Sequence, residues 1–288
     1  MEFKKLTDTY TLNNGVKIPC VGYGTWQAPD DETTVLGIKS ALKAGYRHID
    51  AAAAYANEVS VGKGIKEGLE ENGVARSDLF VTSKVWNTER GYDKAMKAFE
   101  KTLKDLQLDY LDLYLSHWPA TPHQFDNWEE LNLGTWKAMT ELYLSGKVRA
   151  IGVCNCFASH LKALMETEVK PMLNQLEFHP GFTQPEIVDY CRTKNILVEA
   201  WSPLGCGRML SNPLLAEIAT MYGRSVAQIC IRWDLQNGVL PLPKSVTPSR
   251  IEENTRVFDF TLSEEDMAKI NAMPLSGASG LDPDKVDF

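Results

Sequence analysis

The chain has 288 residues, a formal net charge of −8 and 44% hydrophobic residues, a length that suits one large α/β barrel or two smaller domains. The acidic balance excludes a broad surface for nucleic acid or anionic membrane, since phosphate binding needs a basic face. The sequence has no apolar run near the roughly 18 residues that span a bilayer, and MEFKKLTDTY lacks an apolar signal core.

The first elements expected along the chain are a hairpin and then a series of short strands. YTLNNGVKIP places Asn-Gly between two alternating runs, which predicts a β-hairpin. Eight short apolar runs follow, each flanked by polar or helical sequence. We expect strands at CVGYGT (20–25), YRHID (46–50), LFVTSK (79–84), LDLYLS (111–116), VRAIGV (148–153), PMLNQL (171–176), ILVEAW (196–201) and VLPLPK (239–244).

Helical patterns separate these runs, as in YDKAMKAFEKTLKDLQ, where Ala95, Phe99, Thr102, Leu103 and Leu106 keep a near-helical spacing. Eight alternating units predict a closed (β/α)8 barrel formed by residues 1–288 as a single domain. The alternative is an open doubly wound sheet, which would carry G-x-G-x-x-G after its first strand to bind a dinucleotide. The sequence has GYGTWQ there instead. We also expect two helices split at Gly223 within 211–237 and an irregular tail over 275–288.

Reactive side chains follow the ends of the predicted strands. Asp50 ends the second, Lys84 the third, and His117 follows the fourth; Asn155, Gln175, Trp201 and Lys244 end later ones. The carboxyl ends of barrel strands share one rim, where active sites lie. A lysine cation lowers the pKa of a nearby tyrosine and needs a carboxylate partner in a dry pocket. Asp50, Tyr55, Lys84 and His117 therefore predict proton transfer to the oxygen of a carbonyl group whose carbon receives a hydride.

The sequence resembles the aldo-keto reductases over nearly its whole length. HIDAAAAYANE matches the family pattern H-x-D-T-A-x-x-Y-G-N-E, and TSKVWN and LSHWP match the lysine and histidine motifs. GVCNC stands where the family has G-V-S-N-F, and NQLEFHP, EAWSPLG and LPKSVTPSRIEEN match the later cofactor motifs. The resemblance implies a barrel that binds NADPH without a Rossmann motif. It is greatest to short microbial members similar to diketo-gluconate reductases, methylglyoxal reductases and prostaglandin F synthases.

Roles for individual residues follow from the resemblance. Tyr55 is expected to be the general acid, tuned by Lys84 and Asp50, and His117 to orient the carbonyl. Trp201 would stack on the nicotinamide, and Asn155 and Gln175 would bind its carboxamide. Cys154 replaces the usual serine, so one hydrogen bond is weakened, because a thiol is a poor donor. The remaining cofactor-binding positions are Gly24, Thr25, Trp26, Asp50, Ser202, Leu204, Gly205, Lys244, Ser245, Val246, Arg250, Glu253 and Asn254.

Two further groups of residues define the ends of the expected site. Lys244 and Arg250 flank Thr247-Pro248, a helix start, and are expected to form a site for a phosphate monoester, which the resemblance implies is the 2′-phosphate of NADPH. The substrate is a small-molecule carbonyl. Its wall is expected to contain Trp26, Tyr55, Trp86, His117 and Trp118, together with the 118–128 loop and the tail.

Less specific interpretations exist for each of these residues. Tyr55 can be a half-buried aromatic, Asp50 a helix cap, His117 a structural histidine, and Lys244 with Arg250 a solvated cationic face. Cys154 is better explained by packing than by redox chemistry, and the six cysteines without a signal peptide indicate reduced thiols in the cytosol. We expect a monomer that has no metal and binds neither nucleic acid nor membrane.

Two other functions compete with carbonyl reduction. One is an NADPH-binding barrel with a binding or regulatory role and little turnover. The other is a metal-dependent barrel hydrolase, which needs several histidine and carboxylate ligands at strand ends. The family's usual glycine before Asn57 is Ala56 here, and we predict that Ala56 has φ < 0, because alanine at positive φ carries a conformational cost.

Overall fold

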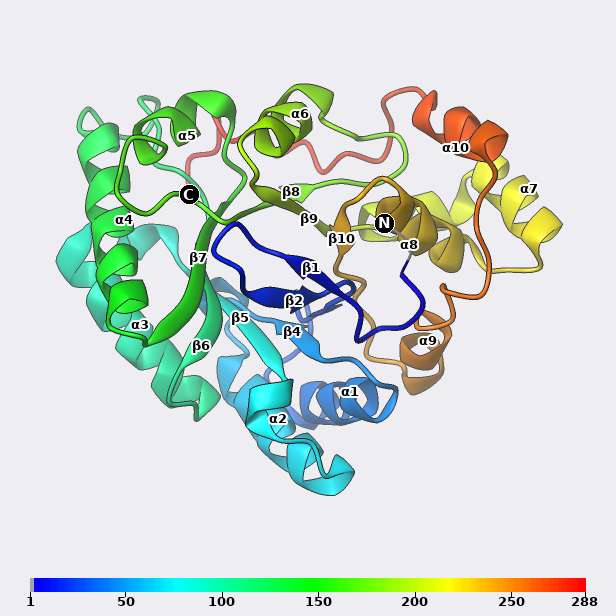
Figure 1. Cartoon of the computed structure of the whole chain (residues 1–288), viewed down its shortest axis with the longest axis horizontal. Coiled ribbons are helices and arrows are strands. Elements are labelled where there is room, and N and C mark those ends of the chain that lie inside the picture. The colour runs from blue at the N-terminus through cyan, green and yellow to red at the C-terminus, as the bar shows by residue number, and fades with distance from the viewer. Residues whose placement is uncertain (1–2) are drawn as a thin grey trace.

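The computed structural model describes residues 3–288, in which eight parallel strands form a ring surrounded by helices (Figure 1). All eight predicted strands are present, and the predicted hairpin precedes them. The strands are β1 Thr9–Thr11, β2 Lys17–Pro19, β3 Tyr23–Gly24, β4 His48–Asp50, β5 Phe80–Val85, β6 Leu111–Ser116, β7 Val148–Cys154, β8 Leu173–Glu177, β9 Leu197–Trp201 and β10 Leu240–Pro241.

The helices lie outside the ring and cover its strands. The α-helices are α1 Glu32–Lys43, α2 Glu58–Asn72, α3 Tyr92–Leu106, α4 Trp128–Leu144, α5 Ala158–Leu164, α6 Pro185–Thr193, α7 Pro213–Tyr222, α8 Val226–Gln236, α9 Pro248–Glu253 and α10 Glu264–Asn271. Short 3₁₀ turns are η1 Ala53–Tyr55, η2 Arg76–Asp78, η3 Asn87–Glu89 and η4 Gly205–Ser211.

The first and last strands close the ring through two backbone hydrogen bonds. Gly22 N donates to Pro241 O at 3.0 Å, and Gly24 N donates to Pro243 O at 3.1 Å. Proline has no N–H, so the last strand can only accept at these positions, which keeps the ladder short. A Cβ on Gly22 would lie 2.4 Å from Leu242 Cδ2 and 2.6 Å from His48 Nδ1, so a larger residue here would displace side chains inside the barrel. The predicted (β/α)8 barrel is confirmed.

The β1–β2 hairpin covers the amino ends of the barrel strands (Figure 1). Asn13 Nδ2 donates to Pro171 O, and Asn14 Nδ2 donates to Arg149 O, both at 3.0 Å. Both carbonyls lie at or just before the starts of barrel strands. One end of the barrel is therefore closed, and the carboxyl ends of the strands remain for a binding site.

The helical pattern and the irregular segments also agree with the sequence. In α3, Ala95, Phe99, Thr102 and Leu106 are buried, whereas Leu103 is partly buried. The expected pair of helices is α7 and α8, separated at Gly223 with φ +62°. Residues 275–288 have no helix or strand. Across residues 3–288, each helix is too short or too polar to cross a membrane.

The prediction for Ala56 is wrong. Ala56 adopts φ +53° and ψ +32° at the end of η1. The chain has to reverse here, because the buried Asn57 side chain donates to Thr25 O and Ala28 O, both at 2.9 Å, before α2 begins. These two bonds hold the turn in the left-handed region although alanine is unfavourable there.

Ala56→Gly is expected to raise the free energy of unfolding by about 0.5 kcal/mol. Glycine removes the left-handed penalty of roughly 1–2 kcal/mol, and its extra freedom in the unfolded chain takes back about 0.4–1 kcal/mol. Urea unfolding followed by tryptophan fluorescence measures the change. Ala53→Gly, at negative φ in the same turn, is the control and should destabilise. Equal destabilisation by both variants would contradict this explanation.

Candidate active site

A cavity of about 880 Å³ lies over the carboxyl ends of the strands. It extends from Asp50, Gln175 and Trp201 at the strand ends to Arg250 on α9. The structure brings most of the predicted site residues to this cavity. The predicted residues that line it are Gly24, Trp26, Asp50, Tyr55, Trp86, His117, Trp118, Asn155, Gln175, Trp201, Ser202, Leu204, Lys244, Ser245, Val246, Arg250, Glu253 and Asn254.

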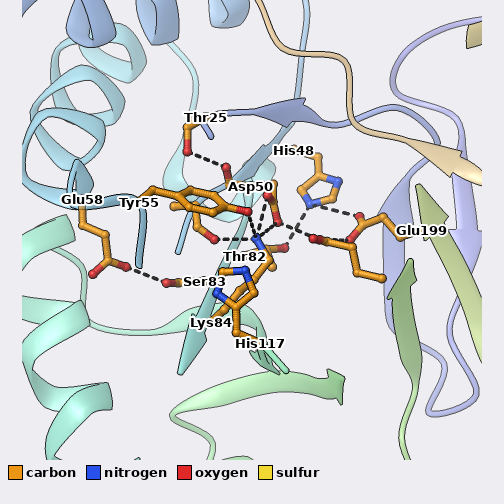
Figure 2. A network of polar contacts seen from close by, with 12 residues as sticks. Thr25, His48, Asp50, Tyr55, Glu58, Thr82, Ser83, Lys84, His117 and Glu199 are labelled. Carbon is orange, nitrogen blue, oxygen red and sulfur yellow. Dashed lines mark hydrogen bonds and ion pairs between the residues drawn. The ribbon is translucent and has the colours of Figure 1, made fainter. Parts of the chain in front are cut away.

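Lys84 is the centre of the polar network at the bottom of the cavity (Figure 2). It is fully buried on β5, and strand pairing sets Asp50 of β4 opposite Thr82. Lys84 lies two residues further along and shares the face of Thr82, so its side chain reaches the Asp50 carboxylate. Its Nζ lies 2.8 Å from both Asp50 oxygens, 2.9 Å from Ala51 O and 3.1 Å from Tyr55 Oη.

These contacts determine the direction of the hydrogen bond at Tyr55. An ammonium group has three hydrogens and no acceptor, and Lys84 Nζ has three partner groups. Lys84 therefore donates to Tyr55 Oη. The phenol O–H of Tyr55 is left to donate to a group in the cavity, which its ring lines.

The charge states in this network follow from burial and from the ion pair. Burial raises the pKa of Tyr55 above its usual range, and Lys84 lowers it less than burial raises it. Burial alone would lower the pKa of Lys84, but the Asp50 carboxylate and Tyr55 raise it, so the net shift is upward. At neutral pH the network holds a protonated tyrosine and a cationic lysine that pairs with Asp50.

His117 lies next to Tyr55 and Lys84 (Figure 2). Its ring makes edge contacts with Tyr55 at 5.6 Å and with Trp86 at 5.1 Å between centroids. Its backbone N–H donates to Val85 O at 3.2 Å, which continues the pairing of β5 and β6. Burial, together with Lys84, holds the pKa of His117 well below its usual range. The neutral imidazole has one N–H to donate.

Asn155, Gln175 and Trp201 form the next part of the cavity wall. Trp201 Nε1 donates to Asn155 Oδ1 at 2.8 Å, and Asn155 Nδ2 donates to His117 O at 3.1 Å. One N–H of Asn155 remains. Gln175 Nε2 donates to Asp50 Oδ1 at 3.0 Å and to Glu199 Oε2 at 2.7 Å, so its Oε1 remains as an acceptor. The wall therefore offers one donor and one acceptor.

The far end of the cavity is cationic. Lys244 is partly buried and donates to Gln27 O at 3.2 Å, and Arg250 lies on α9. Within residues 3–288, neither side chain forms an ion pair with a carboxylate. Two cations without an acidic partner at one end of a cavity make an anion site.

The other end is aromatic and receives the tail of the chain. Trp86 stacks on Phe288 at 5.6 Å, and Trp118 meets the same ring edge-on at 5.4 Å. Asn87 Nδ2 and Gln124 Nε2 donate to Phe288 O at 2.9 and 3.1 Å. Phe288 and Leu281 line the cavity, and our sequence prediction named the tail without naming either residue. Their position depends on long-range packing.

Three predicted cofactor residues lie behind the wall. Thr25 is buried and donates through both N and Oγ1 to Asp50 O, so it holds the strand end in place. Cys154 is fully buried at the end of β7. Gly205 has φ +56° and packs close to Met209 and to Gly277 O. The structure gives these three residues roles in supporting the wall.

Some residues that line the cavity were not assigned a role from the sequence. Ala54 and Pro203 lie within quoted motifs but were not singled out, and Gln27, Cys206 and Val226 lie outside the motifs. Glu199 lies inside the barrel against Gln175, although its motif EAWSPLG was assigned only for the residues after it. Within residues 3–288 there is also no group of three or more histidine, cysteine or carboxylate side chains able to hold a metal ion.

Comparison with known proteins gives one consistent answer. The sequence model of the Aldo/keto reductase family matches residues 20–274. A glyoxal reductase of Bacillus subtilis (strain 168) is 49% identical over 284 residues, 98% of this chain and 99% of that protein. A 9,11-endoperoxide prostaglandin H2 reductase of Trypanosoma cruzi (strain CL Brener) is 45% identical over 278 residues, 95% of this chain and 94% of that protein.

The comparison with a solved structure supports the same family. The crystal structure of the Gox0644 D53A mutant in complex with NADPH superposes with a TM-score of 0.89 at 39% identity, and the match covers 98% of this chain and 99% of that one. Both the sequence model and the relatives cover most of the chain. The chain belongs to the aldo/keto reductase family.

Proposed function

We propose that this protein reduces an aldehyde or ketone to an alcohol, with NADPH as the hydride donor and Tyr55 as the proton donor. One observation carries the proposal: the buried Lys84 bonds Asp50 and Tyr55 at once and leaves the tyrosine O–H for the cavity. The family membership, the glyoxal reductase relative and the NADPH-bound neighbour support the same reaction.

His117, Tyr55 and Lys84 have different roles in the reaction at the carbonyl group. When bound, NADPH supplies a hydride to the carbonyl carbon. The neutral His117 donates its N–H to the carbonyl oxygen and orients it beside Tyr55. As negative charge develops on that oxygen, Tyr55 transfers its proton to it, and Lys84 stabilises the phenolate that remains. Asp50 keeps Lys84 charged and in place throughout.

The cavity wall fits the nicotinamide end of the cofactor. A primary carboxamide has N–H donors and one carbonyl acceptor. The remaining donor of Asn155 and the remaining acceptor of Gln175 complement it. Trp201, fixed by its bond to Asn155, provides a flat aromatic face at the same wall. These residues would hold the nicotinamide ring next to Tyr55 and His117.

The anion site fits the other end. Lys244 and Arg250 would bind the phosphate monoester that distinguishes NADPH from NADH, with Ser245 beside them and Glu253 and Asn254 near the adenine. Lys244 and Arg250 both line the cavity, which favours an anion site over the alternative of a solvated cationic face.

The substrate end favours small, uncharged carbonyl compounds. Trp26, Trp86, Trp118 and Phe288 line it, and the cations that line the cavity, Lys244 and Arg250, lie at the cofactor end. A carboxylate placed among these aromatic rings would lose its hydration and meet only neutral donors, with no cation to pair with it. We therefore infer neutral aldehydes and dicarbonyls as substrates.

A binding or regulatory role with little turnover is the second candidate. It would need the cofactor site but not the aligned Asp50, Lys84, Tyr55 and His117, and the intact network favours catalysis. We further propose that the protein acts as a monomer in the cytosol. In support, one chain supplies the whole network, and five of the six cysteines are buried free thiols.

Tyr55→Phe is expected to lower kcat by about 100- to 10,000-fold, because it removes the general acid. The Kd for NADPH should stay nearly unchanged. Stopped-flow reduction and fluorescence titration measure the two quantities. Tyr92→Phe is the matched control, since Tyr92 donates to Glu141 on the outer surface. A Tyr55→Phe variant with the wild-type kcat would remove Tyr55 from this role.

Arg250→Ala is expected to raise the Kd for NADPH by about 10- to 100-fold, the effect of one lost charge-assisted hydrogen bond. The Kd for NADH should hardly change, because NADH lacks the phosphate. Calorimetric titration of both cofactors tests this. Arg256→Ala is the control, because Arg256 pairs with Glu252 and does not line the cavity. An equal rise in the Kd values of NADPH and NADH in Arg250→Ala would disprove the phosphate assignment.

Para-nitrobenzaldehyde should be reduced with a kcat/KM at least about 10-fold higher than para-carboxybenzaldehyde, because the carboxylate is desolvated without a cationic partner. Glyoxal and methylglyoxal complete the panel, and NADPH absorbance reports turnover. A preference for the carboxylate would overturn the inferred substrate class. Failure to oxidise NADPH with any aldehyde would instead support the binding role.

A further inference from the structure

We propose that Glu199 is a positioning residue that fixes the side-chain amide of Gln175 so that its Oε1 faces the nicotinamide carboxamide. This inference rests on the proposed placement of the nicotinamide at the Asn155–Gln175 wall. It gives a role to a buried carboxyl group that the proton-transfer mechanism does not use.

Glu199 lies inside the barrel below the catalytic network. It is fully buried on β9, where strand pairing sets it directly beside Gln175 of β8. Its Oε1 lies 3.8 Å from His48 Nε2, a residue of β4. Strands β4 and β9 are not neighbours in the ring, so this approach is possible only across the barrel interior. Figure 2 shows Glu199 and His48 pointing toward each other, to the right of Asp50.

The two carboxyl groups determine which way the Gln175 amide points. Its Nε2 donates one hydrogen to Glu199 Oε2 at 2.7 Å and one to Asp50 Oδ1 at 3.0 Å. A half-turn of the amide would place Oε1 against Asp50 Oδ1, which accepts from Lys84 and cannot donate to it, and would leave Glu199 Oε2 without the Nε2–H that it accepts. The observed orientation is therefore strongly preferred before the cofactor binds. The acceptor is presented in advance, which reduces the ordering cost of binding.

Glu199 can do this without disturbing the ion pair of Lys84. Burial, and then the nearby Asp50 charge, raise the pKa of Glu199 to about 8. Its carbonyl oxygen accepts the Gln175 hydrogen even when the acid is protonated. The facing groups are Asp50, Lys84, His48 and Cys154, and burial lowers the pKa of His48 to about 3, so His48 is neutral. The ion pair between Lys84 and Asp50 therefore does not involve Glu199.

A merely structural role for Glu199 makes a different prediction. If Glu199 only filled the barrel interior, replacing it would weaken the binding of every nicotinamide cofactor equally. If it orients Gln175, replacing it should weaken only the binding of cofactors that have a carboxamide N–H. The acetylpyridine analogue of NADP⁺ separates the two cases, because it keeps the carbonyl but has a methyl group in place of the NH₂.

The experiment measures the Kd of NADP⁺ and of the acetylpyridine analogue by fluorescence titration. Glu199→Leu should raise the Kd of NADP⁺ by about 10-fold, the effect of one misplaced hydrogen bond. It should raise the Kd of the analogue by less than about 3-fold. Glu199→Gln retains an acceptor oxygen and should keep the wild-type ratio of the two values. Glu199→Met replaces the leucine variant if the latter does not fold.

Gln175→Leu is the matched control for the placement of the cofactor. It should also raise the Kd of NADP⁺ more than the Kd of the analogue. If both Kd values rise equally, the nicotinamide does not lie at Gln175, and the inference for Glu199 is overturned together with that placement. If Gln175→Leu discriminates but Glu199→Leu does not, only the role of Glu199 is overturned. Loss of the wild-type ratio in Glu199→Gln would also overturn it.

Discussion

The buried ammonium group of Lys84 is the constraint on which the site depends. Removing a cation from water costs several kcal/mol, and a buried charge is stable only when its partners are close and complete. Here each hydrogen of the ammonium has a partner: the Asp50 carboxylate, the Ala51 carbonyl and the Tyr55 hydroxyl. Two of these partners hold the lysine in place, and the third is the reactive group. Satisfying the lysine thus also orients the tyrosine.

The alanines between Asp50 and Tyr55 follow from the same constraint. The chain leaves β4 at Asp50 and must return Tyr55 to the same ammonium group within five residues. Ala51 and Ala52 are fully buried, and Ala51 supplies the carbonyl that Lys84 binds. Larger side chains would separate the two ends of this loop. The left-handed Ala56 is part of the same requirement, because the chain must reverse at once to start α2.

The sequence predicted those features that depend on local pattern and strand order. Asp50, Lys84 and His117 come together because each lies at or just after the carboxyl end of a parallel strand, and these ends share one rim. The conformation of Ala56 could not be predicted this way, because it is fixed by bonds from Asn57 to Thr25 and Ala28, about thirty residues earlier. The arrival of Phe288 over Trp86 has no periodic signal either, since the tail is irregular and its contacts are long-range.

The distribution of charge along the cavity gives the site a direction. The cationic side chains of Lys244 and Arg250 lie at one end of the cavity, and uncharged aromatic rings lie at the other. The chain as a whole nevertheless has a net charge of −8. A ligand with a phosphate at one end and a neutral ring at the other can bind in only one orientation, because reversal would bury the phosphate among Trp86, Trp118 and Phe288. Between the two ends, the amides of Asn155 and Gln175 distinguish donor from acceptor and so fix the face of the ring. If NADPH binds as proposed, the orientation of hydride transfer is set by groups that take no part in the proton transfer.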